Sequence, residues 1–322
     1  MINGVAKTKV SVPKGGGGLA WQAFVLGQPV DHSLSPALHS AAYSYLGQEV
    51  SYGKLPTDVD QLAQRFAMAE QAANVCGFSC TMPLKTAVVQ YLDRLSDCAA
   101  LLGVVNTVCW PQGPGSGISL GHNTDVSGIV NALCWAGARP GSVGSFALLG
   151  GGGTATAALA AARYLGADSV DVYIRHLDRG QNLSKVASKL GLALNFYRLA
   201  TFAQHYRGYS CLVSTLPSGA ADFLGPELRE PTSAILLDVS YDPWPSVLAR
   251  AWQRQGGRVV SGKDMLMYQA IDQVKLFLGF DLEQALPDEL QVMNAMCSAI
   301  GLEPRSQPAH LVYSVQEIAA DS

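Results

Sequence analysis

Short apolar runs alternate with stretches of helical periodicity along most of the chain. In the first part the runs read WQAFVLG, VSYGKLP, GFSCTMP, VVNTVCW and ISLGHNTD. They are rich in β-branched, aromatic and small residues, which is typical of strands. Residues 36–47, 58–73 and 86–101 lie between them and have the apolar spacing of helices. This alternation predicts a first αβ domain.

The second part of the chain repeats the alternation more regularly. Its strand-like runs are SFALLG, SVDVYIR, LNFYRL, CLVSTLP, AILLDVS and GRVVSG. Six strands with intervening helices predict a doubly wound, mostly parallel sheet of the Rossmann type. After Gly262 the pattern becomes helical again, over 265–279 and 288–300. The fold class is therefore α/β, with two domains and C-terminal helices.

These patterns predict the limits of the parts of the chain. Residues 15–18 are four consecutive glycines, so 1–20 is expected to be a flexible leader. The polar tail is expected to be poorly ordered. The predicted parts are a leader at 1–20, a first domain at 21–125, a second at 126–261, helices at 262–302 and a tail at 303–322.

Composition excludes several classes of partner. The chain has 22 Lys+Arg against 25 Asp+Glu and a net charge of −3, so no electrostatic footprint for nucleic acid or an anionic membrane is expected. The apolar stretch 146–166 contains glycines and Arg163, which favours a strand, turn and helix over a membrane span. The N-terminus lacks the features of a signal peptide. The 7 cysteines show no metal-binding spacing, so we expect free thiols, a cytoplasmic protein and no metal site.

A glycine-rich loop opens the second domain. In LLGGGGTATAALAAARYLG, Gly150, Gly152 and Ala155 form a GxGxxA pattern between a strand and a helix, and Gly153 and Thr154 begin the helix. Such glycines let the backbone approach a pyrophosphate at a helix N-terminus. The sequence predicts a dinucleotide site, with a purely structural turn as the alternative.

The end of the next strand indicates which dinucleotide binds. NAD-binding domains usually carry an acid there, roughly 20 residues past the glycines. This chain has Ile174 and Arg175, with Arg179 following. Guanidinium groups suit the 2′-phosphate of NADP. Two solvated arginines are the alternative explanation, and Asp178 keeps NAD as the second candidate.

Six further motifs occur in a fixed order: HSLSP, TMPLK, VVNT, NTDVSG, LGGGG and MLMYQ. Each alone has an ordinary structural explanation; Ser35 before Pro36, for example, could cap a helix. Together they resemble the shikimate dehydrogenase family, over about residues 22–300. The resemblance implies a substrate-binding domain at 21–125, an NADP-binding domain at 126–261 and helices at 262–302 that return to the first domain. It also implies reversible NADPH-dependent reduction of 3-dehydroshikimate to shikimate in chorismate biosynthesis.

The resemblance assigns roles to individual residues. Ser33 and Ser35 match the residues that bind the carboxylate. This role suits their chemistry, because hydroxyl donors satisfy an anion with directional bonds. Lys85 and Asp125 match a catalytic pair, in which the lysine ammonium suits the charge that develops on the ketone oxygen and the aspartate fixes the position of the lysine. Either residue could make the formal proton transfer. The remaining implied site residues are Thr81, Asn106, Tyr241 and Gln269 for the substrate, and Ser214 and Gly262 for the cofactor, beside Gly150, Gly152, Gly153, Thr154, Arg175 and Arg179.

The chain departs from the family pattern at a few positions. The departing residues are Ser79, Cys80, Thr156, Ile174, Ser214 and Asp264. Asp264 is expected to place an acid near the nicotinamide. Ser35 favours shikimate over quinate, because relatives that use quinate often carry threonine there. Two alternatives remain: an NAD-dependent quinate/shikimate dehydrogenase, and a shikimate-sensing protein without turnover. The protein is expected to be a monomer or a homodimer.

Overall fold

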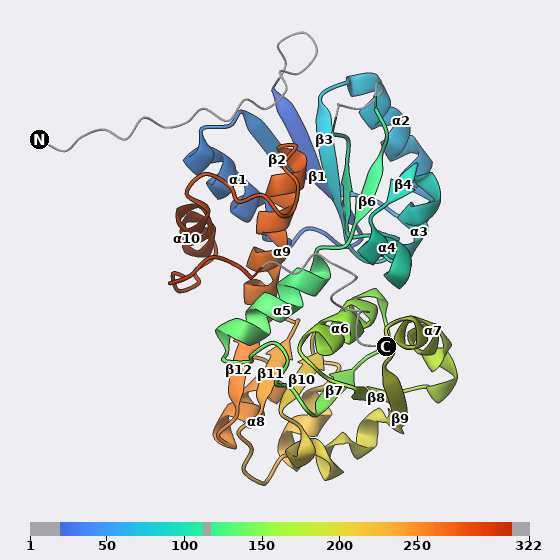
Figure 1. Cartoon of the computed structure of the whole chain (residues 1–322), viewed down its shortest axis with the longest axis vertical. Coiled ribbons are helices and arrows are strands. Elements are labelled where there is room, and N and C mark those ends of the chain that lie inside the picture. The colour runs from blue at the N-terminus through green and yellow to red at the C-terminus, as the bar shows by residue number, and fades with distance from the viewer. Residues whose placement is uncertain (1–19, 112–116, 311–322) are drawn as a thin grey trace, which may run out of the picture. The chain divides into compact units, whose positions relative to one another are not determined.

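The computed structural model describes residues 20–111 and 117–310, apart from the side chains of Asp178 and Arg179 (Figure 1). The predicted leader therefore lies almost wholly outside the described residues. The chain divides into two compact units. Unit 1 contains the described residues of Met1–Arg94, Thr107–Leu120 and Ile271–Pro308, and unit 2 those of Leu95–Asn106, Gly121–Ala270 and Ala309–Ser322. The chain crosses between units more often than the predicted domain boundaries imply, and those boundaries stay a prediction.

Unit 1 is built on a mostly parallel set of strands. β1 (Trp21–Gly27) pairs in parallel with β2 (Val50–Pro56) and β3 (Val75–Cys80), and β3 pairs antiparallel with β5 (Thr107–Cys109). The sheet order is β2-β1-β3-β5-β6-β4, completed by the short strands β6 (Leu120–His122) and β4 (Arg94–Leu95). Every residue of β3 is buried, as expected for a central strand.

Helices surround this sheet. α1 (Ser35–Leu46) follows β1, and α2 (Leu62–Ala72) follows β2. α10 (Glu289–Ala299) comes from the far end of the sequence and packs against α1 (Figure 1). Helix α10 therefore belongs to unit 1, together with residues 271–308.

The continuous helix predicted over 86–101 is wrong. The segment forms a short helix α3 (Leu84–Ala87), a 3-10 turn (Val88–Tyr91), strand β4 and a second helix α4 (Asp97–Leu102). Extended backbone at Leu92 ends the turn. Asp93 then accepts the hydroxyl and the N–H of Ser119 at 2.7 and 2.9 Å. Ser96 starts α4 anew, because its hydroxyl accepts the N–H of Ala99.

Unit 2 has the predicted doubly wound sheet. Its strands are β7 (Phe146–Leu149), β8 (Ser169–Ile174), β9 (Ala193–Arg198), β10 (Cys211–Ser214), β11 (Ile235–Asp238) and β12 (Arg258–Ser261). All pairs are parallel, and the order is β12-β11-β10-β7-β8-β9. Counted from β7, this is the Rossmann order, which reverses between β7 and β10. The predicted fold class is confirmed.

Helices α5 (Asp125–Trp135), α6 (Gly153–Tyr164), α7 (Gln181–Lys189) and α8 (Val247–Arg254) belong to unit 2. One part of its core is aromatic, where Tyr173, Phe202, Tyr206 and Trp252 pack together. The indole N–H of Trp252 donates to the carbonyl of Ala234 at 3.0 Å, so this large side chain is buried without an unpaired donor.

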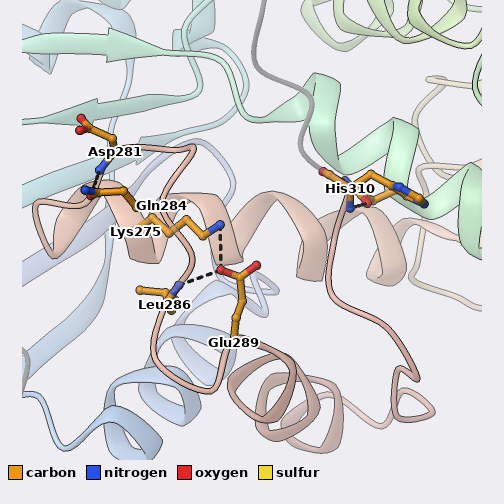
Figure 2. A network of polar contacts seen from close by, with 7 residues as sticks. Lys275, Asp281, Gln284, Leu286, Glu289 and His310 are labelled. Atoms are coloured by element: carbon orange, nitrogen blue, oxygen red, sulfur yellow. Dashed lines mark hydrogen bonds and ion pairs between the residues drawn. The ribbon is translucent and has the colours of Figure 1, made fainter. Parts of the chain in front are cut away.

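Helix α9 (Gly262–Phe277) belongs to unit 2 over 262–270 and to unit 1 over 271–277. Near its end the ammonium of Lys275 lies 2.8 Å from the carboxylate of Glu289 in α10, and the two side chains are only 1% and 8% exposed. Glu289 also accepts the N–H of Leu286 at 2.9 Å (Figure 2). A buried charge pair needs such added hydrogen bonds, and it fixes the register between the two helices.

Residues 303–310 are ordered by two asparagines, contrary to expectation. Asn294 binds both backbone groups of Arg305, at 2.6 Å to the N–H and 3.2 Å to the carbonyl. Asn131 of α5 binds His310 in the same way, at 2.6 and 3.2 Å. Each side-chain amide satisfies a backbone N–H and a backbone carbonyl in a segment that has no partner strand. The rest of the predicted tail lies outside the described residues.

Among the described residues, no helix is long and apolar enough to cross a membrane.

A buried histidine in unit 1 makes stability depend on pH. His39 is fully buried, stacks on Tyr52 at 3.9 Å between ring centroids, and contacts Tyr43 and Gln273 through its two nitrogens. Burial lowers the pKa of His39 to about 3, and its hydrogen bond with Gln273 opposes that shift. The ring is therefore neutral in the folded protein near neutral pH.

We expect His39 to cost stability as the pH falls. The unfolded histidine takes up a proton near pH 6.5, while the folded one does so only near 3, so the unfolded state binds more protons in between. The free energy of unfolding should fall by about 1.4 kcal/mol per pH unit below 6.5 from this group alone. Urea unfolding at pH 7 and pH 5 should show a smaller pH effect in His39→Gln than in the wild type. The exposed-site control His32→Gln should keep the wild-type pH effect; equal slopes in all three proteins would contradict the assignment.

Candidate active site

The loops after β1 and β3 in unit 1 approach each other closely. The N–H of Thr81 donates to the carbonyl of Leu26, and the N–H of Gln28 to that of Met82, both at 2.9 Å. Gly27 has φ +153, and a Cβ on it would lie 2.4 Å from Thr81 and 2.8 Å from the carbonyl oxygen of Met82. Only glycine permits this approach. The predicted site residues of both loops therefore lie at the carboxyl ends of neighbouring parallel strands, where α/β sheets bind ligands.

The two predicted serines lie at the start of α1. Leu34 is the N-cap residue, so Ser35 does not cap the helix. Instead, the hydroxyl of Ser33 accepts the N–H of Ser35 at 3.3 Å. Ser35 is buried and hydrogen-bonds the Tyr52 side chain; this bond and one with Ser79 oppose the rise that burial causes in the pKa of Tyr52. Ser35 thus belongs to a buried polar network.

Ser79, one of the departures from the family pattern, lies in that network. The hydroxyl of Tyr52 donates to the Ser79 hydroxyl at 2.7 Å, and Ser79 donates to the amide oxygen of Gln273 at 2.8 Å. The amide nitrogen of Gln273 donates to Thr107 at 3.0 Å. The serine is therefore satisfied on both sides, which explains why the change is tolerated.

Lys85 lies one residue into α3 and is half-buried. Its loop is held by the N–H of Leu84, which donates to the carbonyl of Thr81 at 2.8 Å. Burial raises the pKa of the nearby Cys80 to about 12, and the charge of Lys85 acts in the opposite direction. The charge of Lys85 therefore acts on a buried side chain, and the half-buried residue is not a fully solvated surface lysine.

Asn106 is the centre of the predicted site in unit 2. Its amide nitrogen lies 2.9 Å from a carboxylate oxygen of Asp125, 2.8 Å from the amide oxygen of Gln269 and 3.0 Å from the hydroxyl of Thr124. Its amide oxygen accepts the N–H of Thr124 at 2.8 Å. Asn106 and Asp125 are each 1% exposed. The structure thus brings together three predicted site residues that are far apart in the sequence.

Asp125 is the first residue of α5. Its N–H donates to the side-chain oxygen of Asn123 at 3.0 Å, and the Asn123 amide donates to the carbonyl of Val104 at the same distance. A carboxylate in the first helical turn is favoured by the helix dipole. Backbone, asparagine and helix end together fix the direction of this carboxylate.

The predicted dinucleotide loop lies where the strand order of unit 2 reverses. Gly150 has φ +107, and a Cβ on it would lie 2.5 Å from the hydroxyl of Thr215, which follows β10. A Cβ on Gly152 would meet nothing within 4 Å, and α6 begins at Gly153 without a side-chain cap. The loop is closed on the sheet side and open at the helix N-terminus, which fits a pyrophosphate group.

The other predicted cofactor residues surround this loop only in part. Arg175 is exposed at the end of β8, and its guanidinium donates to the carbonyl of Ala220 at 3.4 Å. The side chain of Arg179 lies outside what the structure describes. Thr156 is buried and donates to the carbonyl of Gly153 at 2.7 Å, so this departure is a helix-interior residue.

Within unit 2, a close backbone contact requires glycine at position 262. A Cβ at this position would lie 2.0 Å from the carbonyl oxygen of Val239, in the loop that carries Tyr241. Asp264 accepts the N–H and the hydroxyl of Ser261 at 3.1 and 2.7 Å, and so caps the start of α9. The acid expected near the nicotinamide thus serves to start this helix.

The described part of the chain contains no group of three or more His, Cys, Asp or Glu side chains that could hold a metal ion. Sequence reasoning missed Tyr52 and Gln273, which connect Ser35 and Ser79 to the core. Gln273 lies one helical turn after Gln269, and that spacing is the signal that could have identified it.

Comparison with known proteins agrees with the motifs. Residues 25–108 match the family model described as shikimate dehydrogenase substrate binding domain. The NADP(+) shikimate dehydrogenase of Methanothermobacter thermautotrophicus is 31% identical over 264 residues, covering 80% of this chain and 90% of that protein. The Mycobacterium tuberculosis shikimate dehydrogenase structure matches with TM-score 0.75 and 33% identity, covering 87% of this chain and 99% of that one. A Thermus thermophilus shikimate 5-dehydrogenase solved with NADP(H) and shikimate matches with TM-score 0.71 and 30% identity, with coverages of 87% and 99%.

We expect Gly262→Ala to destabilise the protein, because its Cβ would overlap the Val239 carbonyl oxygen. Forced repacking of this kind costs about 1–3 kcal/mol. The matched control is Gly144→Ala, whose Cβ meets nothing within 4 Å and should change stability by less than about 0.5 kcal/mol. Urea unfolding of both variants measures the difference. Equal stabilities would mean that the Val239 loop moves away at no cost.

Proposed function

This chain belongs to the shikimate dehydrogenase family, and we propose that it catalyses the reversible NADPH-dependent reduction of 3-dehydroshikimate to shikimate. The observation that carries the proposal is the Asn106 cluster. Asn106, Asp125 and Gln269 match three motifs of the family, and in unit 2 the Asn106 amide hydrogen-bonds both Asp125 and Gln269. An ordinary structural role for each of the three residues, taken alone, does not explain why they lie together.

The polar side chains suit a small polyhydroxylated carboxylate. Ser33 and Ser35 offer hydroxyl donors to the carboxylate, and Thr81, Asn106, Tyr241 and Gln269 offer donors and acceptors to the ring hydroxyls. A substrate hydroxyl left unpaired in a buried site is costly, so several such groups are needed. We assign these residues to the substrate by their match to the family motifs.

Lys85 and Asp125 are the proposed catalytic pair. NADPH, when bound, supplies the hydride. The ketone oxygen then gains negative charge, which the Lys85 ammonium stabilises while a proton completes the alcohol. Asp125 is held by Asn106 at 2.9 Å, so its carboxylate has a fixed direction. The two residues lie in different units, and their pairing is taken from the resemblance.

We propose the cofactor residues from their match to the family motifs and from the open glycine-rich loop at the start of α6. Gly150, Gly152, Gly153 and Thr154 hold the pyrophosphate at the start of α6, and Arg175 with Arg179 holds the 2′-phosphate. Ser214 and Gly262 are assigned to the cofactor by their match to the family motifs. All 7 cysteines are free, which supports a reducing, cytoplasmic environment. We propose a monomer or homodimer.

The reaction is tested by the absorbance of reduced nicotinamide, with shikimate or quinate and with NADP or NAD. We expect the highest kcat/KM for shikimate with NADP. Arg175→Ala should raise the KM for NADP roughly ten- to a hundredfold, the value of a lost charge-assisted hydrogen bond, and leave that for NAD unchanged. The exposed Arg139→Ala is the control.

Three results would change the proposal. Preference for NAD and quinate would favour the catabolic alternative. Shikimate binding without turnover by either cofactor would indicate a sensor. An equal rise in both cofactor KM values in Arg175→Ala would show that Arg175 does not recognise the 2′-phosphate.

Lys85→Ala and Asp125→Asn should each lower kcat by roughly 10²–10⁴, the range for a lost acid or base. The double variant should lose little more than either single one, because residues that act as a unit are not additive. Lys54→Ala, at an exposed lysine of β2, serves as the control and should keep wild-type kcat. Multiplicative losses in the double variant would show that the two residues work separately.

A further inference from the structure

The loop between β11 and α8 carries Tyr241, and a hydrogen bond between the side chains of Asp238 and Ser246 joins its two ends. β11 ends at Asp238, α8 begins at Val247, and the loop consists of residues 239–246. One carboxylate oxygen of Asp238 accepts the N–H of Ser240 at 3.2 Å. The other accepts the hydroxyl of Ser246 at 2.6 Å. Asp238 therefore binds both the beginning and the end of the loop.

The hydroxyl of Ser246 both donates and accepts a hydrogen bond. Its hydroxyl gives its hydrogen to Asp238 and accepts the N–H of Ala249 at 3.0 Å, which caps α8. Asp238 is 3% exposed and Ser246 is 9% exposed, so water does not replace either partner easily. The start of α8 and the end of β11 are thus joined through one hydroxyl group.

The first residues of the loop are held by hydrogen bonds and close backbone contacts, so they cannot move to offset a change at the other end of the loop. The N–H of Val239 donates to the carbonyl of Ser214 at 3.0 Å, and the carbonyl of Val239 packs against Gly262. Ser240 is tied to Asp238 as well. The position of Tyr241 is therefore set from one side by backbone contacts and from the other by the Asp238–Ser246 bond.

The loop also carries one buried hydroxyl, that of Ser240, without a hydrogen-bond partner among the described residues. Tyr241 is half-buried, and burial together with the charge of Asp242 raises the pKa of its hydroxyl. A buried hydroxyl without a partner is costly, and it is expected where a bound molecule supplies the partner.

We propose that Asp238 and Ser246 are positioning residues for the reaction: their hydrogen bond closes loop 239–246 and holds Tyr241 toward the substrate. This inference rests on the proposed function, in which Tyr241 contacts the substrate. Asp238 and Ser246 do not touch the substrate themselves. The competing explanation is that the pair only stabilises unit 2, and the two explanations predict different kinetics.

The chain offers a matched control for the loss of Ser246. Ser96 caps α4 in the same unit, and its hydroxyl accepts the N–H of Ala99 at 3.3 Å, but no loop carboxylate is bonded to it by the described hydrogen bonds. Ser246→Ala and Ser96→Ala both lose a helix cap, and Ser246→Ala should lower the melting temperature further, because it also removes a hydrogen-bond partner of the buried Asp238 carboxylate. Only Ser246→Ala also opens the loop that carries Tyr241.

The test is a double-mutant cycle with Tyr241→Phe, read as KM for shikimate. Ser246→Ala should raise this KM about tenfold, since a small misplacement of a binding group has effects of this size or larger. It should leave the KM for NADP within about twofold. In the Tyr241→Phe background the same change should alter KM by less than about twofold, because the group being positioned is gone. Ser246→Thr keeps the hydroxyl and should restore the wild-type KM.

Three results would overturn the inference. Equal effects of Ser246→Ala with and without the Tyr241 hydroxyl would show a purely structural role. A tenfold rise of KM in Ser96→Ala would attribute the effect to lost helix capping. Absence of shikimate turnover in the wild type would remove the proposed function, and the inference with it. If Ser246→Ala does not fold, Asp238→Asn replaces it, since the amide nitrogen that replaces Oδ2 cannot accept the Ser246 hydrogen; the same cycle then applies.

Discussion

The carboxamide of Asn106 joins segments that are distant in the sequence, and the geometry of the site in unit 2 depends on it. Its nitrogen binds Asp125 and Gln269, and its oxygen binds the backbone at Thr124. An amide can do this because it carries donors and an acceptor on one rigid plane. Asp125 is buried, so removing this donor would leave a carboxylate in apolar surroundings without one of its partners, which is expensive. The same bond that stabilises the buried charge therefore also fixes its direction.

Backbone contacts impose the second constraint. Gly27, Gly150 and Gly262 each lie where a Cβ would overlap a neighbouring loop, and each of those loops carries a predicted site residue or lies beside one. These close approaches bring strand ends and neighbouring loops together. Ordinary residues would hold the loops apart by the width of a methyl group. The missing Cβ at three positions thus determines the spacing of whole loops.

The sequence predicts the regular parts of this protein well and the irregular parts poorly. Strands β1 and β2 follow from their apolar runs, and the Rossmann sheet follows from six runs separated by helices, because periodicity reports which face is buried. The segment 86–101 has the same spacing, yet Asp93 and Ser96 break it through bonds to Ser119 and Ala99 that no periodicity records. Residues 303–310 are polar, which predicts disorder, but Asn131 and Asn294 order their backbone. The motifs single out Asn106 and Gln269 as candidates, and the spacing from Gln269 could have added Gln273, whereas the contacts of Tyr52 are seen only in the folded chain.

Helix α9 provides a hydrogen-bond partner of one departure from the family pattern and contains the other. Asp264 caps the first turn of the helix through Ser261, and Ser79 is satisfied by Gln273 further along the same helix. Gln269 and Gln273 are one turn apart and lie on the same face of the helix. The amide of Gln269 binds Asn106, and the amide of Gln273 belongs to the network around His39. Beyond them, the buried pair of Lys275 and Glu289 fixes the register of α9 against α10. A buried pair of this kind adds little net stability but strongly disfavours a shifted register, which would leave both charges unpaired. Within unit 1, the same charge pair therefore also fixes the position of the Gln273 amide along α9.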